Sequence, residues 1–159
     1  MSSRGVGRLS LRRARRRAPD DGSATVRMLF LNLPVTDVAA SRAFYTTLGF
    51  SVNEQFSDHT TVSVAVSDAI HLQLATREKL AGFVPEGTRI GDPRQATAAL
   101  YALSCESRDE VDQLVEKAMG AGGGTWMPSQ DHGFVYASSF TDPDGHVWEV
   151  MWMDPANVQ

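Results

Sequence analysis

The sequence has a single cysteine and no long apolar run. One cysteine cannot form an internal disulfide or supply a cysteine-based zinc site, so both are excluded. A membrane-spanning helix needs about 20 apolar residues, and no stretch of the 159 residues approaches that length. With 42% hydrophobic and 21% charged residues, the chain has the composition of one globular domain, which we expect to be cytoplasmic.

Positive charge is concentrated in the first 27 residues. This segment holds eight arginines and two aspartates, whereas the rest of the chain holds 7 basic and 17 acidic side chains. Because an acidic body repels a phosphate backbone, we do not expect the core to bind nucleic acid. Residues 1–27 also lack hydrophobic periodicity and are predicted to be a disordered leader. An arm that binds nucleic acid or a membrane surface, a transit peptide and an over-extended translation start remain open interpretations of it.

The remaining sequence contains one pattern of elements twice. Asp37 and Ser107 each precede a predicted helix, at 38–48 and 108–119, and both are suited to capping its first turn. The caps lie 70 residues apart, which indicates an internal repeat. Alternating or continuous apolar residues predict strands at 29–35, 50–55, 60–66, 69–75, 98–105, 124–127, 134–140 and 146–153.

This repeat predicts an α+β domain over residues 28–155. The first module spans about 28–75, a linker covers 76–97, and the second module spans about 98–153. Each module has the order βαβββ and is too short to bury both faces of its sheet alone. We therefore expect the two modules to form one curved, mostly antiparallel eight-stranded sheet with the helices outside.

Three motifs carry a family resemblance. They are Asn-Leu-Pro-Val-x-Asp at 32–37, Phe-Tyr-x-x-Leu-Gly-Phe at 44–50, and Asp-Pro-Asp-Gly-His-x-Trp-Glu at 142–149. With the order of elements, they resemble the vicinal oxygen chelate superfamily, which includes glyoxalase I, bleomycin-resistance proteins and extradiol dioxygenases. The resemblance covers residues 28–155 and implies a homodimer that binds a small molecule in a concave cavity.

Glu149 is an anomaly within the last predicted strand. It shares a strand face with Val147 and Met151, and burying an unpartnered carboxylate is costly. Its position therefore implies a bound metal, a polar partner, a protonated acid or an edge exposed to water. The resemblance places Glu149 where the family has a metal-binding glutamate, and we predict it to be catalytic.

The other metal positions implied by the resemblance are poorly filled. Phe30 and Leu100 fall where ligands are expected and cannot bind a metal, whereas His71 falls at the remaining position. His71 and Glu149 together make at most two protein ligands, and catalytic zinc commonly has three. A divalent metal therefore remains an open question, and a standard lactoylglutathione lyase is not expected.

Two functions remain open at this point. In the first, Glu149 takes a proton next to a carbonyl while His71 or a weakly held metal polarises the oxygen, as in a glyoxalase-like lyase or isomerase. In the second, the protein sequesters a small molecule without a metal, as the bleomycin-resistance branch does. His132 follows Asp131 and forms either an oriented base or a turn-stabilising hydrogen bond. The predicted substrate-binding residues are Asn32, Phe30, Gln73, Leu100, Met151 and His132, and we expect Asn32, His71, Gln73 and Glu149 in one concavity.

Overall fold

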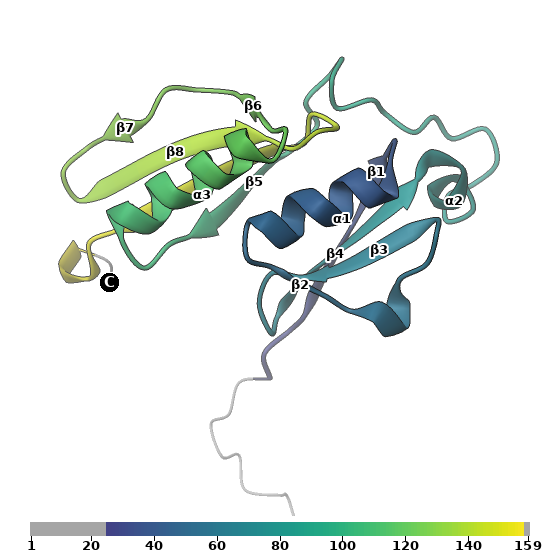
Figure 1. Ribbon diagram of the computed structural model, residues 1–159, viewed down its shortest axis with the longest axis horizontal. Coiled ribbons are helices and arrows are strands. Elements are labelled where there is room, and N and C mark those ends of the chain that lie inside the picture. The colour runs from purple at the N-terminus through teal and green to yellow at the C-terminus, as the bar shows by residue number, and fades with distance from the viewer. Residues whose placement is uncertain (1–24, 158–159) are drawn as a thin grey trace, which may run out of the picture.

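The computed structural model describes residues 25–157. The predicted disordered leader, residues 1–27, lies outside the described residues except for its last three positions. Within the described part, nine strands form two sheets, and three α-helices and two short 3₁₀ helices complete the fold (Figure 1). No helix between residues 25 and 157 is long and apolar enough to cross a bilayer.

The first module contains a four-stranded sheet in the order β1-β4-β3-β2. Strand β1 pairs in parallel with β4, and the other pairs are antiparallel. A 3₁₀ helix, η1, lies between β2 and β3, and α2 follows β4 directly. The bounds are β1 Leu29–Val35, α1 Val38–Thr47, β2 Ser51–Val52, η1 Glu54–Phe56, β3 Thr61–Ala65, β4 Ile70–Thr76 and α2 Arg77–Ala81.

The second module repeats this arrangement in the order β5-β9-β8-β6, and the short strand β7 also pairs with β8. Strand β5 pairs in parallel with β9, as β1 does with β4. The bounds are β5 Leu100–Ser104, α3 Arg108–Gly120, β6 Gly124–Thr125, β7 Gln130–Asp131, β8 Val135–Thr141, β9 Val147–Met153 and η2 Pro155–Asn157.

The predicted α+β fold of paired modules is confirmed, with two differences. The additional short strand β7 gives the second module one strand more than the expected βαβββ order, so the described residues form nine strands instead of eight. In the described part of the chain the strands form two sheets, and β1 and β5 are edge strands that do not pair with each other. The two helix caps are also confirmed. The Asp37 carboxylate accepts from the amide of Ala40 at 3.0 Å, and the Ser107 hydroxyl accepts from the amide of Glu110 at 3.1 Å.

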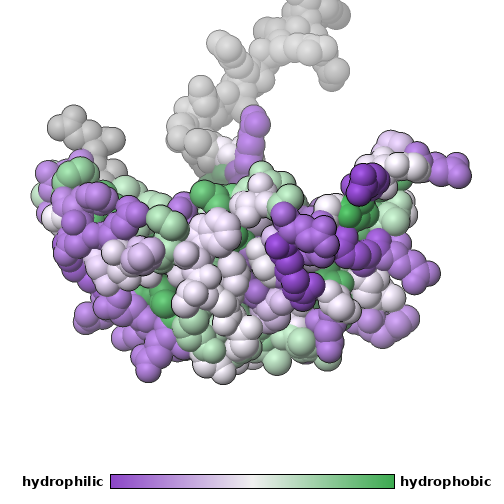
Figure 2. All heavy atoms as spheres, turned by 90° about the horizontal axis from the view of Figure 1, so that it is seen from above, coloured by the Kyte–Doolittle hydropathy of each residue, from purple (hydrophilic) through white to green (hydrophobic). Residues whose placement is uncertain are grey.

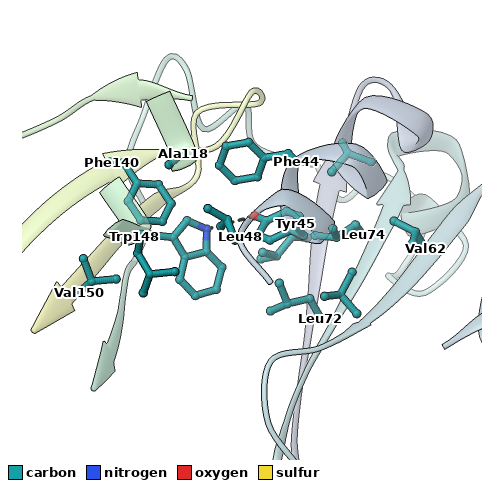
Figure 3. Packing of buried hydrophobic residues seen from close by; sticks show 14 of the residues in the cluster. Phe44, Tyr45, Leu48, Val62, Leu72, Leu74, Ala118, Phe140, Trp148 and Val150 are labelled. Carbon is teal, nitrogen blue, oxygen red and sulfur yellow. Dashed lines mark hydrogen bonds between the residues drawn. The ribbon is translucent and has the colours of Figure 1, made fainter. Parts of the chain in front are cut away.

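One hydrophobic core joins the modules. Helix α1 packs on the first sheet, α3 packs on the second, and the two helices contact each other. Figure 3 shows Phe44 and Tyr45 of α1 facing Phe140 and Trp148 of the second sheet. All four side chains are fully buried, and burial of a large apolar side chain contributes roughly 1.5–3 kcal/mol. The modules are therefore held as a single unit.

The turn between β8 and β9 adds polar contacts to this boundary. The Tyr45 hydroxyl donates to Oδ2 of Asp142 at 2.8 Å and accepts from the Trp148 indole at 3.0 Å. The other Asp142 oxygen accepts from the backbone amides of Asp144 and His146 within the turn. Burial raises the pKa of Asp142, whereas the charge of His146 and these hydrogen bonds lower it.

The two other polar side chains of this turn reach strand β1 and the residue after it. Asp144 accepts from the amide of Thr36 at 2.9 Å, and Nε2 of His146 lies 2.8 Å from the carbonyl oxygen of Pro34. Residues 142, 144, 146 and 148, which alternate along the chain, thus all bond to the first module. The motif at 142–149 is a bridge between modules as well as a tight turn.

Candidate functional site

Strand pairing decides which side chains of the second sheet face away from the core. Trp148 and Val150 of β9 are buried in the hydrophobic core, so the intervening Glu149 points to the opposite face. Glu149 pairs with Ala102 of β5 and with Ser139 of β8. These three residues therefore stand side by side on the outward face of the sheet.

Glu149 lies in a hollow of about 210 Å³ on this face. The carboxylate is half-buried, and no hydrogen bond or ion pair reaches it from residues 25–157. Several walls are large apolar side chains that remain exposed, with Leu100 at 49%, Trp126 at 45% and Met127 at 54%. The lining residues are Leu100, Trp126, Met127, Pro128, Gln130, Ala137, Ser138, Ser139, Glu149 and Met151.

A second hollow, of about 450 Å³, lies on the outward face of the first sheet. Asn32 of β1 and Gln73 of β4 are paired neighbours and both line it. The Gln73 amide donates to the Ser63 hydroxyl at 2.8 Å, which fixes the orientation of the amide. The exposed aromatic side chains of Phe56 and Phe83 form apolar walls.

Phe30 and His71 are paired neighbours two residues before Asn32 and Gln73 on the same strands. Their rings stack with centroids 5.0 Å apart and planes inclined by 16°. The His71 Nε2 lies 3.3 Å from the carbonyl oxygen of Asp68, so the other ring nitrogen remains available. Phe30 is 52% exposed.

Within one copy of the chain, the predicted site residues fall into separate places. Asn32 and Gln73 share the hollow of the first module, whereas Glu149, Leu100 and Met151 share that of the second. The expected single concavity of Asn32, His71, Gln73 and Glu149 is therefore not formed within one copy, because neither hollow contains residues of both modules. The separation follows from the two sheets, because each ends at its own edge strand and the modules meet through their helices and the 142–149 bridge.

His132 lies in the exposed turn between β7 and β8, and its Nε2 is 3.4 Å from Oε1 of Gln130. Its neighbour Asp131 does not orient it. Both Asp131 carboxylate oxygens accept from the Arg108 guanidinium, at 2.6 and 3.0 Å. These bonds, together with the amide of Gly133, lower the pKa of Asp131 to about 2. The alternative of an oriented base at Asp131–His132 is therefore not supported.

The residues of one copy do not fit the metal site that the family resemblance implies. Among residues 25–157 there is no group of three or more histidine, cysteine, aspartate or glutamate side chains placed to hold a metal ion. Phe30 and Leu100 supply apolar surface at the positions where ligands would stand.

The sequence did not single out several residues that line the two hollows. Ser139 lies beside Glu149 through the pairing of β8 with β9, which no local pattern specifies. Phe56 and Phe83 are recognised only in the structure, where their side chains are 60% and 65% exposed.

Comparison with solved structures shows the same fold in several proteins. A hypothetical protein from S. aureus superposes with a TM-score of 0.67 at 23% identity, covering 81% of this chain and 95% of that chain. A glyoxalase-related enzyme from Fulvimarina pelagi gives 0.68 at 22% identity, covering 79% and 87%. A glyoxalase/bleomycin resistance protein/dioxygenase family enzyme from Burkholderia phytofirmans PsJN gives 0.62 at 20%, covering 78% and 96%.

No curated protein sequence matches the chain with significance. The family model of the Glyoxalase/Bleomycin resistance protein/Dioxygenase superfamily, by contrast, matches residues 27–150, which include the first module, the linker and the second module as far as Val150 in β9. The chain belongs to the glyoxalase/bleomycin resistance protein/dioxygenase superfamily.

Proposed function

We propose that the protein binds a small, partly apolar carbonyl compound against the outward face of β9, and that Glu149 removes a proton next to the carbonyl. The observation that supports this is the half-buried Glu149 carboxylate, which has no partner within residues 25–157 and is surrounded by apolar walls. A general base must reach the proton that it abstracts. A carboxylate already engaged by an arginine, as Asp131 is, would not be available.

We also propose that the working unit is a homodimer. Phe30 on the first module and Leu100 on the second are about half exposed, and each lies on an edge strand. Large exposed apolar patches commonly mark interaction surfaces. In a twofold dimer, the patch around Phe30 and the patch around Leu100 would be covered in both copies. Figure 2 shows apolar (green) residues at several separate places among polar ones on the surface in view. Such a dimer would bring His71 of one copy toward the partner's Glu149.

A second candidate is a protein that sequesters its ligand without converting it, and the placement of His71 favours it. In one copy this histidine stacks on Phe30 and does not share the hollow of Glu149, so the carbonyl oxygen of a ligand held there lacks that polarising group. The single cysteine, Cys105, forms no disulfide, which supports a cytoplasmic location for either function.

The two candidates are separated by solvent exchange and by turnover. Hydroxyacetone is incubated with the protein in D₂O, and deuterium entry at the carbon next to the carbonyl is followed by NMR. In parallel, the turnover of an electrophilic compound in the presence of a thiol is measured, with and without added Ni, Zn, Mn or Fe. Enzyme-dependent exchange that is lost in Glu149→Gln supports proton transfer by Glu149.

The matched control is Glu116→Gln, which removes an exposed carboxylate on α3 and should leave exchange unchanged. Saturable quenching of tryptophan fluorescence by a ligand, through Trp126, with neither exchange nor turnover would favour sequestration. Exchange that persists in Glu149→Gln would remove Glu149 from the reaction. Elemental analysis of protein purified without chelator tests separately for a bound metal.

A further inference from the structure

A third hollow lies under the linker that joins the modules. Its volume is about 320 Å³, at the lower end of the range for small-molecule sites, which is roughly 300–1,000 Å³. Its walls come from β1, α2, the linker, β5 and the start of β9, and most are apolar. Among them are Leu33, Leu80, Val84, Ile90, Thr97 and Val147.

Two arginines fasten the linker to the body of the protein. Arg77, the first residue of α2, donates to the carbonyl oxygen of Ile90 at 3.0 Å and lies 3.7 Å from Asp92. Arg94 donates to the carbonyl oxygen of Pro143 at 2.9 Å in the turn of the second module. The Arg77 contacts hold the linker to the first module and the Arg94 contact holds it to the second, so the hollow is formed before any ligand binds.

The floor of this hollow is the boundary between the modules. Pro34 and His146, which are hydrogen-bonded across that boundary, both line it. Tyr101 also lines it, and its ring packs against Trp148 with centroids 5.2 Å apart. Burial raises the pKa of Tyr101, so its phenol stays protonated at neutral pH and can donate a hydrogen bond. A ligand here would contact both modules and the linker at once.

The charge of the lining indicates the kind of ligand. Arg89 is the only arginine, lysine, aspartate or glutamate in the lining. Arg77 and Arg94 have acidic or carbonyl partners, whereas the guanidinium of Arg89 has no ion pair or hydrogen bond with any residue in 25–157. Guanidinium groups bind carboxylates well. We propose that this hollow binds a small organic carboxylate. The apolar part of the ligand lies under the linker, and its carboxylate forms an ion pair with the Arg89 guanidinium.

This site is separate from the one proposed around Glu149, and its test is independent of that function. Phenylacetate is titrated into the uniformly ¹⁵N-labelled full chain, and backbone amide shifts are recorded. We expect saturable shifts at Thr97, Tyr101 and Val147. Phenylacetamide, which has the same shape without the charge, should bind about fivefold more weakly.

Two variants complete the test. Arg89→Gln should weaken phenylacetate binding by about fivefold and leave phenylacetamide unaffected. Lys117→Gln removes one positive charge from the distant helix α3 and should change neither. The proposal is overturned if phenylacetate shifts Ser63 and Gln73 instead of the linker-side amides, if no saturable shift occurs, or if Arg89→Gln binds as tightly as the unchanged protein.

Discussion

The Tyr45 hydroxyl donates to Asp142 at 2.8 Å, and these residues, one on α1 and one just after β8, come from different modules. The same hydroxyl accepts the indole N–H of Trp148, so three buried side chains satisfy one another. A network of this kind stabilises only while every member is present, because a buried polar group left without a partner costs free energy.

We expect Tyr45→Phe to lower the free energy of unfolding by roughly 1–3 kcal/mol, because it leaves Oδ2 of Asp142 and the indole N–H of Trp148 without a partner. Urea unfolding followed by circular dichroism measures this change. Tyr136→Phe is the matched control, since its hydroxyl donates to Asp112 on the exposed surface. An equal loss of unfolding free energy in both variants would contradict the expectation that the buried Tyr45 hydroxyl contributes more than an exposed one.

Protonation of Asp142 should make the free energy of unfolding depend on pH. Burial raises its pKa above the ordinary value of 3.8, so the folded protein binds this proton more tightly than the unfolded chain does. The contribution of Asp142 to stability is therefore complete below pH 3.8 and falls as the pH rises through its higher folded pKa. The difference in free energy of unfolding between the unchanged protein and Asp142→Asn, measured by urea from pH 4 to 7, should shrink with increasing pH. A difference that grows over this range would contradict the raised pKa.

Gly145 is required by the backbone of the bridging turn. Its φ is +94°, and an added Cβ would stand 3.0 to 3.2 Å from atoms of Arg94. We expect Gly145→Ala to reduce the free energy of unfolding by about 1–3 kcal/mol. Gly91→Ala is the control, because Gly91 has no positive φ and nothing within 4 Å of its Cβ position, and thermal unfolding should show it unchanged or slightly stabilised.

If the proposed dimer forms through β5, a charge placed on this strand should disrupt it. Leu100→Glu places a charge on an exposed apolar edge and should convert a dimer to monomer in light scattering at micromolar concentration. Phe134→Glu, an equally exposed apolar residue outside the two outward hollows, should leave the assembly intact. A monomer for the unchanged protein under these conditions would rule the homodimer out.

The fold could be predicted because its signals are local. Asp37 and Ser107 cap the expected helices, and the repeat between modules is visible from their spacing. The predicted strand at 50–55 is shorter in the structure and ends at Val52. There the Asn53 side chain accepts from the amide of Gln55 and starts a 3₁₀ helix in place of the strand.

The site was less predictable because its geometry depends on long-range contacts. Alternation along β9 placed Glu149 and Met151 on one face correctly, but no local pattern states which residues of other strands stand beside them. The motif at 142–149 is visible in the sequence as part of the family resemblance. Its bonds to Pro34, Thr36 and Tyr45, about a hundred residues earlier, have no signature in the nearby sequence.

Asn32 lines both the hollow on the first sheet and the hollow under the linker. One amide cannot satisfy two ligands with the same hydrogen atoms, so a molecule that engages it from one side withdraws it from the other. If a ligand in each space engages this amide, the two occupancies are thermodynamically coupled, and by reciprocity each ligand alters the affinity of the other by the same factor.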